Sequence, residues 1–178
     1  SAPFKIPERC PECDSIVEKD ENAVSLLCVN SNCIAQVKER LIHFAGKGQM
    51  DIDSLGPAVI EQLVNKELIK TFADLYELSE FDLASLEGMG PTTAHNIINS
   101  IKKSKTQPLW RFLAGLSIPK VGSKTAQILA DKFHTINKLL NASKNCFKNI
   151  DQIGESIGNK IYEYFNNPVN RNIILELF

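Results

Sequence analysis

Residues 88–94 read Gly-Met-Gly-Pro-Thr-Thr-Ala, and the central pair of this stretch, an apolar residue followed by glycine, recurs along the chain. The four copies are Leu55-Gly56, Met89-Gly90, Val121-Gly122 and Ile153-Gly154, so the glycines lie 34, 32 and 32 residues apart. Four positions after the glycines stand Ile60, Ala94, Ala126 and Gly158, and seven positions after them stand Leu63, Ile97, Leu129 and Ile161. A fixed period with matched apolar and small positions is typical of repeated supersecondary units.

Each copy predicts a helix, a tight glycine turn and a second helix. Glycine permits the positive φ that we expect in such a turn. Pro57 and Pro91 follow their glycines directly, and proline suits the first position of a helix. A small residue one turn further on lets the second helix approach the first. The alternative is that the glycines merely end ordinary helices of a bundle, but four copies in near register favour the repeated unit.

The predicted turn leaves free backbone N–H groups at a helix N-terminus. Together with the helix dipole, these groups form an anion site that suits a phosphate. The stretch from Gly88 to Ala94 is similar to the helix-hairpin-helix motif, and this resemblance implies binding to the nucleic-acid backbone without reading of sequence. The predicted DNA-contact residues are Gly88, Gly90, Thr92, Thr93, Lys120, Gly122, Ser123, Lys124, Thr125, Gly154 and Ser156.

The first and fourth turns are expected to bind phosphate less well than the second and third. Asp51 and Asp53 stand at the entry to the first turn, which is therefore expected to be mostly structural. Glu155 directly follows Gly154 and weakens the fourth anion site.

The charges are distributed unevenly along the chain. Residues 1–87 hold 8 Lys/Arg and 16 Asp/Glu, whereas residues 88–178 hold 12 and 5. Between Gly88 and Lys124 there is no acid, and the bases there are Lys102, Lys103, Lys105, Arg111, Lys120 and Lys124. This split favours a polyanionic partner for the second half. The alternative is a solvated basic face, but the acid-free stretch coincides with the second and third turns.

Four of the five cysteines are clustered near the N-terminus. Cys10, Cys13, Cys28 and Cys33 have the spacing C-x2-C-x14-C-x4-C, which predicts four thiolates around one tetrahedral Zn²⁺. Such a closed shell leaves no position for water, so the zinc is expected to be structural, and it would supply the folding energy of this short segment. A disulfide pair and a redox C-x-x-C are the less favoured alternatives.

Cys146 has no partner at ligand spacing and is expected to be a buried small residue. His43 is expected to pack or to form a hydrogen bond rather than to bind the metal.

These patterns predict a mainly α fold, with four tandem helix-hairpin-helix units preceded by a small four-cysteine zinc finger. The predicted domains are the finger at residues 1–35, a connecting helix at residues 36–50 and the helix-hairpin-helix domain at residues 51–178. The apolar fraction of 43% is sufficient for a core. No apolar run approaches the ~20 residues of a membrane span, and no signal peptide is visible, so we expect an intracellular setting and no membrane partner.

The combination of finger and hairpins resembles the C-terminal half of bacterial NAD-dependent DNA ligase, over roughly residues 6–178. The segments that carry this resemblance are Leu41-Ile42-His43-Phe44, Met50-Asp51-Ile52-Asp53, Gly88-Met89-Gly90-Pro91 and Asn170-Arg171-Asn172. The stretch Gly46-Lys47-Gly48-Gln49 departs from the family's Ser-Arg-x-Ala, which puts a DNA contact by Lys47 in doubt. The second cysteine pair is spaced by four residues, where the family often has five.

The resemblance implies a parent enzyme that seals nicks in double-stranded DNA during replication and repair, with NAD and Mg²⁺ as its cofactors. This chain has no Lys-x-Asp-Gly adenylation motif and no catalytic residues that we can identify, so it should not be active alone. The implied partners are nicked duplex DNA and other domains of the same ligase, in the bacterial cytoplasm and associated with the nucleoid. The alternatives are a hairpin module of another repair or recombination protein, and a helical protein scaffold.

Overall fold

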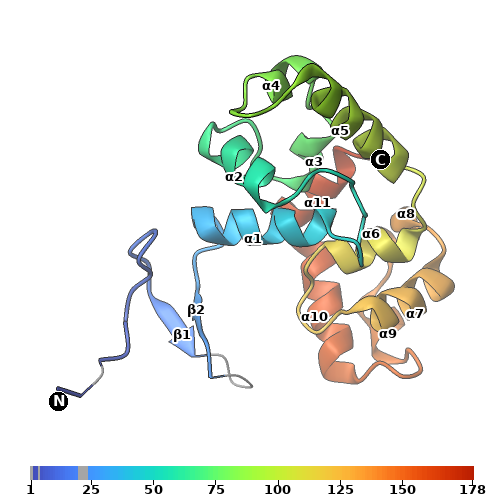
Figure 1. The fold of residues 1–178 in the computed structure, drawn as a ribbon. Coiled ribbons are helices and arrows are strands. Elements are labelled where there is room, and N and C mark those ends of the chain that lie inside the picture. The colour runs from blue at the N-terminus through green and yellow to red at the C-terminus, as the bar shows by residue number, and fades with distance from the viewer. Residues whose placement is uncertain (1, 4, 20–23) are drawn as a thin grey trace.

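The computed structural model describes residues 2–3, 5–19 and 24–178. A small two-stranded sheet precedes a helical body, and helix α1 joins the two parts (Figure 1). Strands β1 (Val17–Lys19) and β2 (Leu26–Cys28) are antiparallel, with Val17 opposite Cys28. We call the described residues 5–19 and 24–33 the finger.

The helices account for most of the chain from residue 34 onward, which confirms the predicted mainly α fold. They are α1 (Ile34–Ala45), α2 (Pro57–Asn65), α3 (Phe72–Leu75), α4 (Glu80–Ala84), α5 (Pro91–Ser104), α6 (Leu109–Gly115), α7 (Ser123–Phe133), α8 (Ile136–Asn141), α9 (Lys144–Lys148), α10 (Glu155–Asn166) and α11 (Pro168–Leu175). None of the described helices is both long enough and apolar enough to cross a membrane.

The four expected helical hairpins are present. Helix α1 packs on α2, α4 on α5, α6 on α7, and α9 on α10. The second helix of each pair begins directly after one of the four periodic glycines. Because α1 is the first helix of the first hairpin, the chain passes from the finger into the hairpins without an intervening linker. The division at residues 35/36 and 50/51 remains a prediction.

The repeated apolar positions form the core of the helical body. Leu63, Ile97, Leu129 and Ile161, each seven residues after a glycine, are all 0% exposed. Phe44 links the first hairpin to the rest of the core, because its ring stacks on Phe72 with centroids 5.1 Å apart and meets the ring of Phe112 edge-on at 6.1 Å. Burial of these side chains against one another stabilises the stack of hairpins.

The small position of the repeat sets how closely the two helices of a hairpin approach. Ala94, Ala126 and Gly158 are buried there, and in the first hairpin the larger Ile60 is buried as well. The approach is closest in the fourth hairpin, where a Cβ added to Gly158 would lie 2.2 Å from the carbonyl oxygen of Phe147. Helices α9 and α10 could not pack in this way with any side chain at residue 158.

We therefore expect Gly158→Ala to destabilise the protein by about 1–3 kcal/mol, because α9 must move away from α10 to make room for the methyl group. A loss of stability would distinguish close helix packing from an unconstrained helix, in which replacing glycine by alanine stabilises by roughly 1 kcal/mol. Urea unfolding followed by circular dichroism measures the change. Gly48→Ala is the matched control, because a Cβ at Gly48 meets no atom within 4 Å. Equal or greater stability of the Gly158 variant would contradict the packing.

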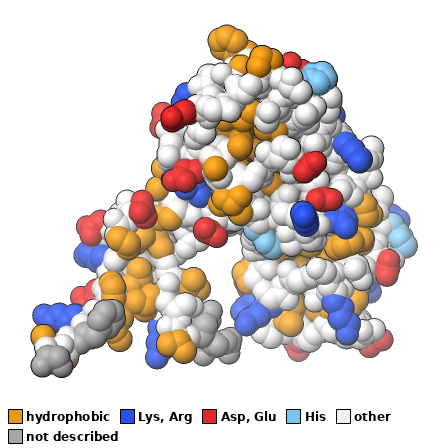
Figure 2. Space-filling model, in the orientation of Figure 1, with side chains coloured by type: hydrophobic (Ala, Val, Ile, Leu, Met, Phe, Trp, Pro, Cys, Tyr) orange, Lys and Arg blue, Asp and Glu red, His pale blue; other side chains and the backbone are white. Residues whose placement is uncertain are grey.

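The finger extends away from the helical body and carries much of the exposed apolar surface of the described chain (Figure 2). Ile16, Leu27 and Val29 are 59%, 48% and 52% exposed. With so few apolar side chains buried, this segment cannot draw its stability from a core of its own.

Candidate metal centre and nucleic-acid interface

The four clustered cysteines are brought together in the finger. Their sulfur atoms all lie within 4.8 Å of one another, with 3.8 Å between Cys10 and Cys33 and 3.5 Å between Cys13 and Cys28. Tetrahedral zinc with Zn–S bonds of about 2.3 Å requires sulfur atoms about 3.8 Å apart. The donor set therefore fits one metal ion of this kind, and no disulfide joins the described cysteines.

Backbone hydrogen bonds shape the two loops that present the cysteines. In the first loop, the Asp14 N–H donates to the Cys10 carbonyl at 2.8 Å, and Asp14 adopts a φ of 59° to close the turn. In the second loop, the Cys33 N–H donates to the Asn30 carbonyl at 3.0 Å. Cys28 ends β2 and Cys33 is the N-cap of α1, so the metal site joins the sheet to the first hairpin.

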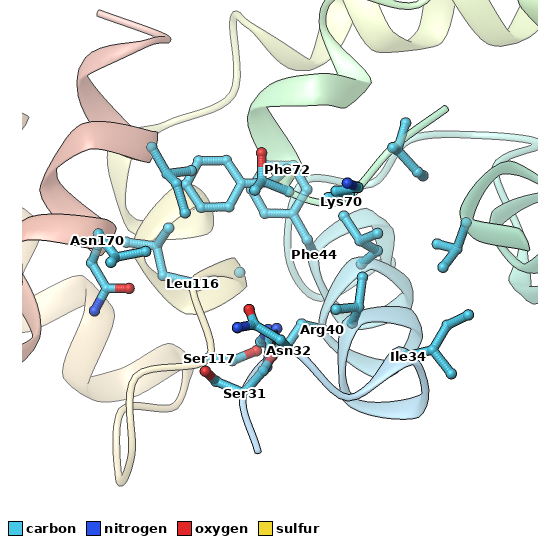
Figure 3. Close-up of a pocket in the computed structure, with 18 of the residues that line it drawn as sticks. Ser31, Asn32, Ile34, Arg40, Phe44, Lys70, Phe72, Leu116, Ser117 and Asn170 are labelled. Carbon is cyan, nitrogen blue, oxygen red and sulfur yellow. Dashed lines mark hydrogen bonds between the residues drawn. The ribbon is translucent and has the colours of Figure 1, made fainter. Parts of the chain in front are cut away.

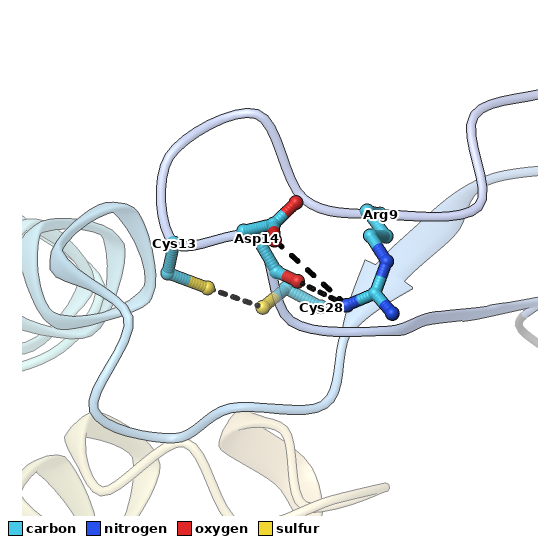
Figure 4. A network of polar contacts seen from close by, with 4 residues as sticks. All are labelled: Arg9, Cys13, Asp14 and Cys28. Atoms are coloured by element: carbon cyan, nitrogen blue, oxygen red, sulfur yellow. Dashed lines mark hydrogen bonds and ion pairs between the residues drawn. The ribbon is translucent and has the colours of Figure 1, made fainter.

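A charged pair braces the first loop from outside (Figure 4). The Arg9 guanidinium donates to the Asp14 carbonyl at 2.9 Å and lies 3.9 Å from the Asp14 carboxylate. Both side chains are largely exposed, so the ion pair itself stabilises little. Its geometric effect is to hold the turn that separates Cys10 from Cys13.

The cysteine pKa values reflect the close approach of the sulfur atoms and their neighbouring hydrogen-bond donors. Hydrogen bonds from the side chain and backbone of Ser15 lower the pKa of the Cys13 thiol to about 6. A backbone hydrogen bond from Asn30 lowers the pKa of Cys28, but desolvation and the neighbouring sulfur atoms outweigh it and raise that pKa to about 12. Thiolates this close repel one another, so all four can ionise together only when a metal ion supplies compensating charge.

Two residues outside the cluster were assigned roles from sequence. Cys146 is exposed on α9, which corrects the expectation that it is buried. Its neighbour Phe147 occupies the buried side of that short helix, and adjacent residues of a helix point about 100° apart. His43 forms the expected hydrogen bond, with its Nε2 atom 2.8 Å from the Ala114 carbonyl oxygen, and so joins α1 to α6.

The four glycine turns share one geometry that the sequence pattern did not reveal. Each is a four-residue turn closed by a backbone hydrogen bond from the residue before the periodic glycine. The bonds run from Leu55 to Ile52 (3.3 Å), Met89 to Leu86 (3.3 Å), Val121 to Ile118 (3.0 Å) and Ile153 to Ile150 (3.1 Å). The accepting residues repeat with the same spacing as the glycines, and all are buried. This apolar position was the signal in the sequence that could have located the turns.

The positive φ of each turn lies two residues before the periodic glycine, which corrects our expectation. The left-handed residues are Ser54 (63°), Gly88 (74°), Lys120 (65°) and Gln152 (66°). The periodic glycines are extended, with φ of −87° at Gly56, −84° at Gly90, −94° at Gly122 and −66° at Gly154. Any residue can adopt that backbone, so the turn conformation does not require glycine there.

The periodic glycines are instead the N-caps of α2, α5, α7 and α10. A Cβ added to any of them meets no atom within 4 Å, so the described protein leaves the space beside them open. Elsewhere in this chain the N-cap side chains of Ser79, Thr135 and Asn167 accept hydrogen bonds from first-turn N–H groups. The glycines thus leave the first-turn N–H groups of the hairpin helices uncapped, and they let another molecule approach the backbone closely.

The residues predicted to contact DNA are all accessible. Gly90 and Thr125 are half-buried, and the others are exposed: Gly88, Thr92, Thr93, Lys120, Gly122, Ser123, Lys124, Gly154 and Ser156. Their contact with DNA remains a prediction.

Not every base of the acid-free stretch is available to a phosphate. The Arg111 guanidinium donates to the carbonyl oxygens of Lys47 and Gln49, both at 2.9 Å, and so clamps α6 to the loop after α1. A base outside that stretch is also engaged, because in the fourth hairpin the Lys148 ammonium lies 3.6 Å from the Glu155 carboxylate.

An open groove of about 840 Å³ lies between the start of α1, the loop before α3, the loop after α6 and helix α11 (Figure 3). Phe44 and Phe72 line its apolar floor, and Arg40 and Asn170 are polar residues of its lining. The sequence pattern predicted no function for it.

The hairpins match known family models, and nearly the whole chain is similar to known proteins. Residues 111–174 match the family described as helix-hairpin-helix motif, and residues 50–103 match the SAM-like helix-hairpin-helix tandem. A DNA ligase of Koribacter versatilis is 41% identical over 174 residues, which are 98% of this chain and 26% of that protein. A DNA ligase of Syntrophomonas wolfei is 43% identical over 171 residues, 96% of this chain and 26% of the relative. The chain thus spans about a quarter of the length of these curated relatives.

Proposed function

We propose that this chain, which aligns with DNA ligases over nearly its whole length, is the DNA-binding, non-catalytic part of a NAD-dependent DNA ligase. In this role it grips nicked duplex DNA through the phosphate backbone and the minor groove during replication and repair. The observation that carries the proposal is the set of uncapped glycine N-termini, each open to the outside, in a chain that aligns with DNA ligases.

The physical basis of binding is the match between a helix N-terminus and a phosphate. Free N–H groups donate to phosphate oxygens, and the helix dipole favours the negative charge. In the second hairpin, Gly88, Gly90, Thr92 and Thr93 would supply backbone and hydroxyl donors. In the third hairpin, Gly122 with Ser123 and Thr125 would do so beside two lysines. Since phosphates are the same at every step of the duplex, such contacts position the protein without reading bases.

The two outer hairpins are expected to contribute less. The Asp53 carboxylate accepts from the Ser54 N–H at 3.0 Å, which places negative charge within the first turn. In the fourth hairpin, Gly154 and Ser156 are available, but Glu155 competes with a phosphate for the helix N-terminus. Binding should therefore be centred on the second and third hairpins.

Cys10, Cys13, Cys28 and Cys33 would hold a structural Zn²⁺. With all four positions filled by thiolates, the ion would stabilise the finger and leave no open position for substrate. NAD and Mg²⁺ would serve the parent enzyme through its other domains, which are also the expected protein partners of this chain. We retain the proposed boundaries, with the finger at residues 1–35, the connecting helix at 36–50 and the helix-hairpin-helix domain at 51–178, where the connecting helix packs as part of the first hairpin. The proposed setting is the bacterial cytoplasm with its nucleoid.

Titration of a nicked duplex at several salt concentrations tests the proposal. Each phosphate that the protein neutralises should add about 0.9 to the slope of log K against log salt. We expect the double variant Lys120→Ala/Lys124→Ala to flatten that slope by about one to two units, because both ammonium groups are exposed beside the third turn.

The control for this prediction is the double variant Lys5→Ala/Lys19→Ala, which removes two positive charges from the finger. The same titration with an intact duplex shows how far binding depends on the nick, and duplexes of different sequence should bind equally. An unchanged slope in the double variant would remove the third hairpin from the interface, and a wild-type protein without salt-dependent binding would refute the function.

A further inference from the structure

The third residue of each hairpin turn is held in a conformation that favours glycine. A four-residue turn with positive φ at its third position usually has glycine or asparagine there. In this chain only the second hairpin meets that preference, with Gly88, whereas the third and fourth hairpins carry Lys120 and Gln152. Pro119 precedes Lys120 and fixes the second position of its turn, so nothing in the local sequence relieves the strain.

The side chains of Lys120 and Gln152 have no partner that would explain this strain. Both are exposed, and within the described part of the chain neither forms a hydrogen bond or an ion pair. A Cβ added at the equivalent Gly88 meets no atom within 4 Å, so this position of the turn also opens to the outside. Backbone strain of this kind clusters at functional sites, so a strained residue without an internal role is the basis for a hypothesis of contact outside the protein.

These two side chains begin only two residues before the N-cap glycine, whose N–H groups are the proposed phosphate site. A lysine ammonium and a glutamine amide are both hydrogen-bond donors to phosphate oxygen. Ser54 occupies the same position in the first hairpin, but the neighbouring Asp53 carboxylate accepts its N–H and would repel a phosphate. The argument therefore applies to the third and fourth hairpins.

We infer that Lys120 and Gln152 keep a left-handed backbone because their side chains complete the phosphate contacts of the third and fourth hairpins. This inference rests on the function proposed above, and it makes Gln152 a DNA-contact residue that the sequence pattern does not identify. The inference also requires that replacing either residue by glycine raises the stability of the protein and weakens its binding to DNA.

A rival explanation is that this chain simply tolerates left-handed residues. Glu67 and His134 also have positive φ, at 58° and 64°, and neither lies in a hairpin turn. Under this explanation, glycine at residue 120 or 152 would raise stability and leave DNA binding unchanged.

The variants Lys120→Gly, Lys120→Ala and Gln152→Gly separate the two explanations. Both glycine variants should melt about 2–4 °C higher, because glycine adopts positive φ without strain, whereas Lys120→Ala should gain nothing. Lys120→Gly and Lys120→Ala should each flatten the salt slope for a labelled nicked duplex by about 0.9. Gln152→Gly should weaken binding roughly three- to tenfold at an unchanged slope, because its amide carries no charge.

Gly88→Lys is the reciprocal variant and should show the opposite signs, with a lower melting temperature and a salt slope steeper by about 0.9. If the glycine variants bind like the wild type while melting higher, the rival explanation holds and the inference is wrong. If they do not melt higher, the premise of strain is wrong. A wild-type protein that does not bind DNA at all would instead refute the proposed function, and the melting temperatures would still report on the strain.

Discussion

Replacing Cys28 by serine is expected to abolish metal binding and unfold the finger while the helical hairpins remain folded. Cys28 supplies one of four ligands, and a serine hydroxyl is a poor substitute for a thiolate on zinc. The finger has little buried apolar surface, with Ile16, Leu27 and Val29 exposed, so we expect metal binding to be its main source of folding energy. The hairpins have a continuous core, and no side chain of the finger belongs to it.

Elemental analysis should detect about one zinc per chain in the wild type and none in the variant. Circular dichroism should retain nearly all of the helical signal, with a small loss from the first turn of α1, whose N-cap is Cys33. Limited proteolysis should then cut within residues 5–33. Cys146→Ser is the matched control, because Cys146 is exposed and is not a member of the cluster, so this variant should keep its zinc. Collapse of the entire helical signal would show that residues 1–35 are not a separate folding unit.

Replacing both Gly90 and Gly122 by aspartate is expected to reduce DNA affinity strongly without reducing stability. Each site has room for the new side chain, since a Cβ there meets no atom within 4 Å. Aspartate is a preferred N-cap residue, so its carboxylate will accept from the first-turn N–H groups and stabilise α5 and α7 by a few tenths of a kcal/mol. The same carboxylate occupies the donors that a phosphate needs and repels it. Hydrogen bonds to charged groups are worth about 1.5–3 kcal/mol, so each replacement should weaken binding about 10- to 100-fold.

Two single variants calibrate this result. Gly48→Asp adds the same charge at an open glycine that does not begin a hairpin helix, and it should change affinity little. Gly56→Asp alters the first hairpin, where Asp53 already places negative charge, and its effect should be smaller than that of either Gly90 or Gly122. Thermal melting monitors stability, and titration of a nicked duplex monitors affinity. Undiminished binding by the Gly90/Gly122 double variant would show that these helix N-termini do not meet the DNA.

The clustering of the four cysteines was the feature best predicted from sequence. The spacing of Cys10, Cys13, Cys28 and Cys33 limits how the chain can loop, and the structure brings all four sulfur atoms within 4.8 Å. The hairpins were predictable for a similar reason, because glycines 34, 32 and 32 residues apart are accompanied by buried positions such as Ile97 and Leu129. One signal is a fixed cysteine spacing and the other is a nearly regular repeat.

The conformation of the turns was predicted less well. A glycine in a turn suggests positive φ, yet Gly90 and Gly122 are extended and the left-handed residues are Gly88 and Lys120. Lysine gives no sequence signal for this conformation, since its preference is for right-handed backbone. The positive φ occurs inside a turn that a hydrogen bond closes between two apolar residues packed into or against the core.

The sequence by itself determined which four cysteines cluster, the number of hairpins and the side of each hairpin that is buried. Those properties follow from residue type and from spacings that can be read directly along the chain. Only the tertiary structure decided that the glycine corners face outward, that Arg111 is engaged by the loop after α1, and that Cys146 is exposed. These outcomes depend on which helices meet and at what distance, and packing between residues far apart in sequence sets both.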